Sequence, residues 1–169
     1  MKKLFVLVFT LLIGCVFAYS EVKLGVVNAQ ELLAKTKKGV EVTKRLSELQ
    51  NKKQTEMKTM QDEAQKLEKE LQSPALNEDA REKKTLELDA KQKNIKRYLE
   101  DARNEWEREY QKEMMEFEKD LMPIIESVGK AKGFTLIFDV SGRGGIIYVD
   151  PTTDITEEVV KAVDAKFPK

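Results

Sequence analysis

The chain has 169 residues, of which 36% are charged, 41% are hydrophobic and only 7% are aromatic. This composition suits a long solvated helical structure better than a compact enzyme, and it indicates one domain with an extended appendage. Lys and Arg together number 30, as do Asp and Glu, so the formal net charge is zero. A neutral chain has no electrostatic basis for gripping phosphates, and we expect no nucleic-acid partner.

Histidine is absent, and the only cysteine is Cys15, close to the N-terminus. Zinc sites, thiol chemistry and Ser-His-Asp or Cys-His catalysis are therefore excluded from the mature protein. A carboxylate pair or a magnesium site remains formally open, but among so many Asp and Glu residues chance pairs mean little. We expect a protein that is not an enzyme, with no catalytic residue, no cofactor and no metal site.

A secretory signal peptide is predicted at residues 1–18. Lys2 and Lys3 give a positive start, and the apolar stretch that follows is about ten residues long, too short to span a bilayer. Small residues precede a cleavage site after Ala18, so we expect export to the periplasm. Removing Lys2 and Lys3 from the 30 basic residues leaves 28, against 30 acidic ones, and makes the mature chain slightly acidic.

A second interpretation of the same segment is lipidation. The residues Leu12-Ile13-Gly14-Cys15 resemble a bacterial lipobox, in which Cys15 would be acylated and would tether the protein to a membrane. The apolar residues directly after Cys15 argue against it, because tethers usually begin with polar, flexible residues. Either route exports the protein.

The centre of the chain predicts a helical hairpin over residues 31–132. No glycine occurs between Gly39 and Gly129, and only the segment around Pro74 interrupts a run rich in Lys, Glu, Gln and Leu. Proline lacks an amide hydrogen and disfavours helix in the residue before it, so the chain is expected to reverse near residues 73–78. Asn77 or Asp79 could then cap the second helix.

Apolar residues recur at steps of three and four along both predicted helices, the heptad rhythm of a coiled coil. Singly, each is best explained as a residue of the helix–helix seam, whereas the set as a whole could contact a binding partner. Lys53 and Gln92 fall at seam positions, so we expect loosely paired helices. Val42, Leu86 and Met115 are expected off the seam, as apolar spots on a charged surface. The candidate residues for the seam and for contact with a binding partner, which would be a client if the protein is a chaperone, are Leu46, Leu49, Met57, Met60, Leu67, Leu71, Leu86, Ile95, Leu99, Trp106, Tyr110, Met114, Met115 and Phe117.

The flanks of the hairpin, residues 19–30 and 133–169, predict a small β body. Strands are expected at residues 22–28, 134–140 and 146–150, the last two joined by a hairpin turn in the glycine-rich segment 142–145. A terminal helix is predicted to open at Asp154-Ile155-Thr156-Glu157. Its buried stripe would be Ile155, Val159, Val163 and Phe167.

So small a body buries too little apolar surface to hold a long arm alone, and self-association is the economical solution. Pro123, inside the return helix, is a candidate hinge where the arm meets the body. The candidate oligomerisation residues are Val22, Leu24, Val26, Phe134, Leu136, Phe138, Ile147 and Val149.

Several segments together resemble the Skp (OmpH) family of periplasmic chaperones: the export signal, residues 23–28 (Lys-Leu-Gly-Val-Val-Asn), the charged hairpin, residues 133–139 (Gly-Phe-Thr-Leu-Ile-Phe-Asp) and residues 154–156 (Asp-Ile-Thr). The resemblance implies an α+β fold in which a small β body carries a long antiparallel coiled-coil hairpin, or tentacle. It also implies a homotrimer whose three tentacles enclose a cavity for unfolded outer-membrane proteins.

We therefore expect an ATP-independent holdase whose partners are unfolded outer-membrane β-barrel proteins and further copies of itself. Contact with the membrane surface is expected to be weak at most, because the mature chain is slightly acidic whereas well-studied members of the family are basic. The alternative is a structural or adaptor coiled-coil protein of the envelope, either free or lipid-tethered through Cys15.

Overall fold

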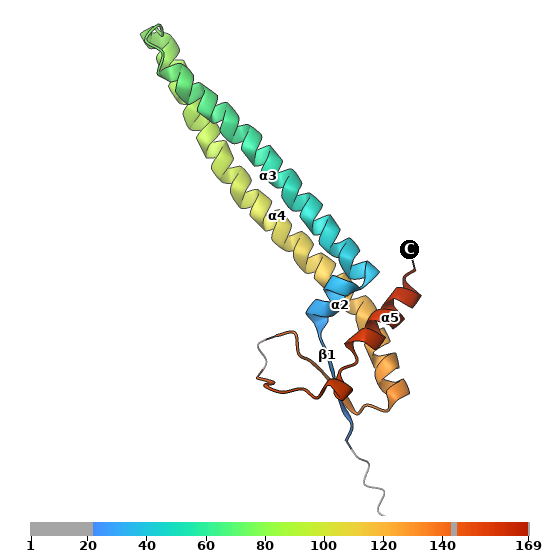
Figure 1. Cartoon of the computed structure of the whole chain (residues 1–169). Helices are drawn as coiled ribbons and strands as arrows, with labels where there is room; N and C mark the ends of the chain where they lie inside the picture. Colours follow the sequence, from blue (N-terminus) through green and yellow to red (C-terminus); the bar gives the residue numbers. More distant parts are fainter. Residues whose placement is uncertain (1–21, 143–144, 169) are drawn as a thin grey trace, which may run out of the picture.

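The computed structural model describes residues 22–142 and 145–168. Two long antiparallel helices form an arm, and a small base closes one end of it (Figure 1). In chain order the elements are β1 (Leu24–Val27), α2 (Ala29–Lys35), α3 (Lys37–Leu71), α4 (Glu78–Lys132), β2 (Leu136–Asp139), the 3-10 turn η1 (Pro151–Thr153) and α5 (Thr156–Lys166). This is the predicted α+β architecture. The predicted signal peptide, its cleavage site and Cys15 lie outside the described residues.

The arm reverses direction between α3 and α4. Asn77 caps α4, because its side chain accepts a hydrogen bond from the amide of Ala80 at 2.9 Å. Arg81 closes the reversal by donating to the carbonyls of Leu71, at 2.5 Å, and Ser73, at 3.1 Å. At 1.5 Å per residue, the 35 residues of α3 extend about 50 Å.

The base of the arm contains a helix break that the sequence analysis did not predict. Thr36 has an extended backbone, with φ −73° and ψ 145°, and it separates α2 from α3. Gly39 allows the two helices to meet closely, because a Cβ built on it would lie 2.1 Å from the carbonyl oxygen of Leu33. The predicted hairpin from residue 31 is therefore two helices on this side, a short α2 that belongs to the base and the long α3.

The sheet has two strands, β1 and β2, which run parallel with Leu24 opposite Leu136 and Val26 opposite Phe138. The prediction of a third strand at residues 146–150, joined to the second by a hairpin turn, was wrong. One edge of β1 pairs with β2, and the other is occupied by Asp154, which forms a bridge to Val26. Residues 146–150 lie outside this sheet, and Ile147 is fully exposed.

The hydrophobic core lies where α5 packs against α2 and the lower part of α4. Val42 was expected on the surface, but its side chain is only 1% exposed and belongs to this core, because the α2–α3 break places the first turns of α3 inside the base. The predicted stripe of α5 faces inward, with Phe167 at its edge. The buried core residues are Val27, Leu32, Val42, Phe117, Leu121, Ile124, Ile155, Val159 and Val163.

Candidate functional site

The seam between α3 and α4 is apolar in part only. Among the predicted seam residues Leu67 and Phe117 are buried, and Ala64 beside Leu67 is buried too. The predicted seam residues that are half-buried are Leu46, Leu49, Met57, Met60, Leu71, Ile95 and Met114. Most of the arm is therefore held together by side chains that remain partly in contact with water.

A polar cluster occupies the seam in the middle of the arm. Lys53 lies there as predicted and pairs with Glu105 across the helices at 2.7 Å. Tyr98 donates a hydrogen bond to Glu56 at 2.5 Å. Burial and the neighbouring Glu56 carboxylate raise the pKa of Tyr98 to about 12, while the hydrogen bond from Lys53 lowers the pKa of Glu105. Polar side chains therefore replace the leucines that would pair the helices tightly at this point.

Three residues assigned to the seam lie outside it. Leu99 is 58% exposed, Trp106 is 36% exposed and Tyr110 is 40% exposed. Tyr98, one position before Leu99, and Glu105, one position before Trp106, face α3 instead. There Tyr98 hydrogen-bonds to Glu56, and Glu105 pairs with Lys53. Trp106 and Tyr110 stack on each other with ring centroids 5.2 Å apart. Leu99, Trp106 and Tyr110 are spaced by seven and then four residues, so they share one face of α4. This spacing could have indicated a second apolar face beside the seam.

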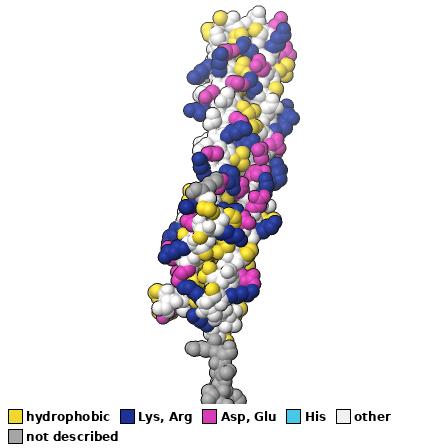
Figure 2. Space-filling model, turned by 90° about the vertical axis from the view of Figure 1, so that its right-hand side faces the viewer, with side chains coloured by type: hydrophobic (Ala, Val, Ile, Leu, Met, Phe, Trp, Pro, Cys, Tyr) yellow, Lys and Arg dark blue, Asp and Glu magenta, His cyan; other side chains and the backbone are white. Residues whose placement is uncertain are grey.

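The outer surface of the arm is densely charged, with both signs interspersed and small apolar spots between them (Figure 2). Leu86 and Met115, predicted as such spots, are exposed. Among the described residues, five ion pairs bridge α3 and α4. They are Lys38–Asp120, Arg45–Glu113, Lys53–Glu105, Lys84–Glu70 and Lys91–Glu63.

A mostly apolar groove opens where the arm meets the base, with a volume of about 560 Å³. We call it the base groove. Its walls come from α2, α4 and β2, and its charged lining residues are Glu118 and Asp139. Its apolar lining residues include Leu33, Tyr110, Met114, Met122, Ile125 and Ile137.

One face of the sheet is exposed and apolar. Leu24, Leu136 and Phe138 lie on it, and Val22 just before β1 is exposed as well. Val26, also predicted as an oligomerisation residue, lies on the same face opposite Phe138, but its side chain is only 7% exposed. Of the other residues predicted for this role, Ile147 is fully exposed, whereas Phe134 and Val149 are half-buried.

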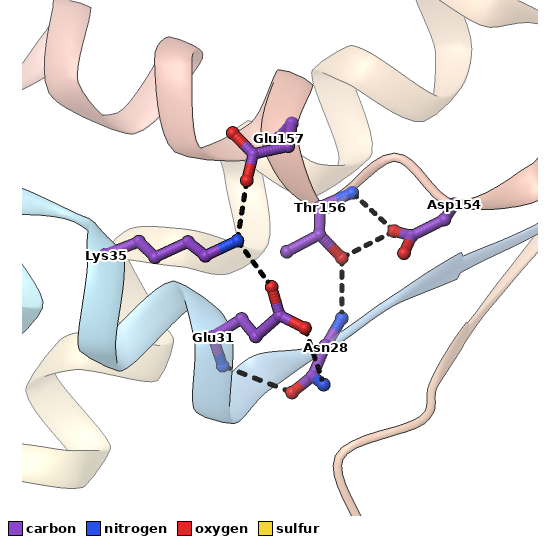
Figure 3. Close-up of polar contacts among 6 residues, drawn as sticks. All are labelled: Asn28, Glu31, Lys35, Asp154, Thr156 and Glu157. Carbon is purple, nitrogen blue, oxygen red and sulfur yellow. Dashed lines mark hydrogen bonds and ion pairs between the residues drawn. The ribbon is translucent and has the colours of Figure 1, made fainter. Parts of the chain in front are cut away.

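A hydrogen-bonded network ties α2 to α5 and fixes the base from which the arm projects (Figure 3). Lys35 bridges Glu31, at 2.7 Å, and Glu157, at 2.6 Å, and these two carboxylates, Glu157 first, raise the pKa of Lys35. Thr156 accepts a hydrogen bond from the amide of Asn28 at 3.0 Å. It also donates to Asp154 at 2.6 Å, so β1, α2 and α5 share one polar cluster.

Within residues 22–142 and 145–168, no group of His, Cys, Asp or Glu side chains is arranged to hold a metal ion. No helix in the same part of the chain has the length and hydropathy needed to cross a membrane. Pro123 lies inside α4, on its exposed side near the base.

Comparisons with known proteins agree with this architecture. The family described as outer membrane protein (OmpH-like) matches residues 23–163. An uncharacterized protein from Aquifex aeolicus (strain VF5) is 31% identical over 168 residues, which cover 97% of each chain. A crystal structure from Caulobacter crescentus CB15, described as an OmpH-like outer membrane chaperone, aligns with a TM-score of 0.73 at 23% identity and covers 85% of both chains.

A base with a two-stranded sheet and a long helical arm is thus a fold that this chain shares with a solved structure. Because the family match spans nearly all the described residues, the chain belongs to the OmpH-like family, the Skp family of the sequence analysis.

Proposed function

We propose that the protein is an ATP-independent holdase chaperone of the periplasm, which binds unfolded outer-membrane proteins and prevents their aggregation in transit. The observation that carries the proposal is the arm itself. On this long charged hairpin the side chains of Leu86, Leu99, Trp106 and Met115 are exposed. The description of the Caulobacter relative as an outer membrane chaperone supports the same role.

The chemistry of the arm suits weak binding of many different clients. Scattered apolar spots can each cover one exposed side chain of a client, and methionine adapts to irregular partners. Affinity then comes from the number of contacts and from confinement. The sequence has no P-loop lysine and the mature chain has no histidine or cysteine, so we propose that no nucleotide or catalytic step is involved. Folding of the client into its membrane would drive release by mass action.

We further propose that the bases associate, as a homotrimer, through the exposed sheet face. Leu24, Leu136 and Phe138 form a contiguous apolar surface on β1 and β2, and such a surface on a small protein usually marks an interface. Association would group several arms around one client. The mass of the mature protein in solution tests this, and a monomer at micromolar concentration would contradict it.

Export is proposed on the signal peptide, with cleavage after Ala18. Mass spectrometry of the mature N-terminus distinguishes this cleavage from acylation at Cys15. A mature chain that begins at Tyr19 supports a free periplasmic protein, whereas a lipid-modified Cys15 would support the tethered alternative.

Light scattering tests the holdase activity. A urea-denatured outer-membrane β-barrel protein is diluted into buffer with increasing amounts of the mature protein, and an unrelated helical protein at equal mass concentration serves as the control. We expect scattering to fall in the presence of the chaperone only, for several unrelated barrel proteins. Undiminished aggregation at excess chaperone would refute the proposal, and protection of a single client would favour an adaptor.

A further inference from the structure

Leu99, Trp106 and Tyr110 form one exposed line along α4, which we call the outer stripe. An α-helix of eleven residues makes about three turns, so Leu99 and Tyr110 point in nearly the same direction. The same steps of seven and four lead on to Phe117 and Leu121, which are buried in the base. The stripe is thus the face of α4 that forms core at the base, and farther out along the arm no described element of the chain buries it.

The outer stripe leads directly into the base groove, because Tyr110 belongs to both. Beyond Tyr110 the groove continues along α4 past Met114 to Met122 and Ile125. Leu33 from α2 and Ile137 from β2 form its opposite wall. The stripe and the groove therefore make one continuous apolar track, with a stacked aromatic pair near its middle.

The length of the track matches one extended peptide segment. Leu99 and Met122 are separated by a helical distance of about 35 Å. An extended chain covers this distance in about ten residues, and a transmembrane β-strand has about nine to eleven.

The width and charge of the track also constrain what can lie on it. The stripe is one side chain wide, and the exposed Arg103 and Glu107 lie beside it on α4. A segment with one apolar face and one polar face fits such a surface, and strands of outer-membrane barrels alternate in this way. At the groove the flanking charges are Glu118 and Asp139, both acidic. Burial alone would raise the pKa of Asp139, but hydrogen bonds from Ser141 and Ala29 outweigh this effect, so the pKa is lowered overall. The carboxylate therefore stays ionised and favours a basic residue beside it.

We propose that the outer stripe and the base groove together bind one extended segment of an unfolded outer-membrane protein, about one transmembrane strand long, with its apolar face on α4. The inference rests on the proposed function and names its binding surface. Trp106 and Tyr110 are the anchors, since stacked aromatic side chains offer a large apolar area at little entropic cost.

The chain supplies its own probe, because Trp106 is its single tryptophan. The mature protein is titrated with a tryptophan-free ten-residue peptide of alternating apolar and polar residues that ends in lysine, and with a peptide of the same composition whose apolar residues are contiguous. We expect the emission of Trp106 to move to shorter wavelength and its quenching by acrylamide to fall, with the alternating peptide only. Unchanged emission, or an equal response to both peptides, would overturn the proposal. A shift that follows dilution of the protein alone would show that a second copy covers the stripe, and would overturn it too.

Variants give a second, independent measurement. Leu99→Ala combined with Tyr110→Ala should weaken binding of a fluorescently labelled alternating peptide by about tenfold, as expected for the loss of central apolar anchors. The matched control combines Val40→Ala with Tyr148→Ala, which removes exposed apolar side chains that belong neither to the track nor to the candidate client contacts, and it should change the affinity less than twofold. Far-UV circular dichroism establishes that both variants stay folded. Equal losses in both would overturn the proposal.

The scattering assay distinguishes failure of the proposed binding surface from failure of the proposed holdase function. Suppressed aggregation with an unaffected Trp106 would leave the holdase intact and remove the outer stripe as its binding surface. Aggregation that is not suppressed would refute the holdase itself.

Discussion

Thr36 is the joint between the base and the arm, and its replacement tests how the arm is fixed. Its side chain is completely buried. The hydroxyl donates to the carbonyl of Leu32 at 2.7 Å and accepts from the amide of Gly39 at 3.0 Å. One hydroxyl thus ends α2 and caps α3.

Thr36→Val keeps the shape of the side chain and its extended backbone but removes both hydrogen bonds. Loss of a helix cap costs about 1 kcal/mol or more, and a buried donor without a partner costs about 1–3 kcal/mol. The two costs are not added, because both describe the Gly39 amide that loses its partner. The carbonyl of Leu32 keeps a partner, since it still accepts the backbone hydrogen bond from Thr36 at 3.1 Å. We expect a loss of about 2 kcal/mol in the free energy of unfolding.

Thr36→Ser makes the opposite change, since it keeps the hydroxyl and removes a buried methyl group. Its cost should be smaller, about 1 kcal/mol. Thr55→Val is the matched surface control, because Thr55 makes the same type of bond, to the carbonyl of Asn51, on the exposed side of α3. It should be nearly neutral.

The assay is urea unfolding followed by far-UV circular dichroism, at one fixed chain concentration because association would alter the midpoint. We expect Thr36→Val to destabilise more than Thr36→Ser, and Thr36→Ser more than Thr55→Val. A Thr36→Val protein as stable as the wild type, or more stable than Thr36→Ser, would refute the view that this hydroxyl fixes the arm to the base.

Two further predictions concern the same joint and the arm. Gly39→Ala should destabilise by about 1–3 kcal/mol through overpacking, because the new Cβ meets the Leu33 carbonyl, whereas Gly142→Ala meets nothing within 4 Å and should be neutral in the same urea assay. The arm should also lose stability in acid, since hydrogen bonds from basic partners across the seam lower the pKa of four of its glutamates from 4.5. A lowered pKa gives stability that is present above the unfolded value and lost as the pH falls through the folded one. Urea midpoints measured from pH 7 to 3 should therefore fall below about pH 4.5, and a flat profile would contradict the role of these pairs. The glutamates are Glu63, Glu70, Glu105 and Glu113.

The arm was the most predictable part of the fold, because its signals are local. The absence of glycine, the heptad steps, Pro74 and the Asn77 cap all act within a few residues of the chain. Which face of α4 meets α3 was predictable only in part. Tyr98 and Glu105 are favoured at the seam by the long-range partners Glu56 and Lys53, and hydrophobic periodicity alone prefers Leu99 and Trp106.

The base was less predictable, because its pairing is non-local. Parallel β1 and β2 are separated by the whole arm, and the edge of β1 that a third strand might have used is taken by Asp154. The break at Thr36 combines a local signal, the Thr36 cap on the amide of Gly39, with the close approach of Gly39 to Leu33, which hydrophobic periodicity does not reveal. Because this break turns α3 into the base, it also moves Val42 from the expected surface into the core.

The distribution of buried residues suggests why the client surface lies where it does. All nine buried residues of the core cluster belong to the base or the adjoining turns of α3 and α4. Farther out, Ala64 and Leu67 are the buried apolar side chains among the described residues, and half-buried apolar side chains and partly exposed ion pairs hold the rest. Such pairs contribute little stability in water. The arm should therefore open locally far more readily than the base, as regions with little buried apolar surface do. The outer stripe begins on this weakly held part and ends at the rigid core, so a client segment can be met by a surface that adapts at one end and is fixed at the other.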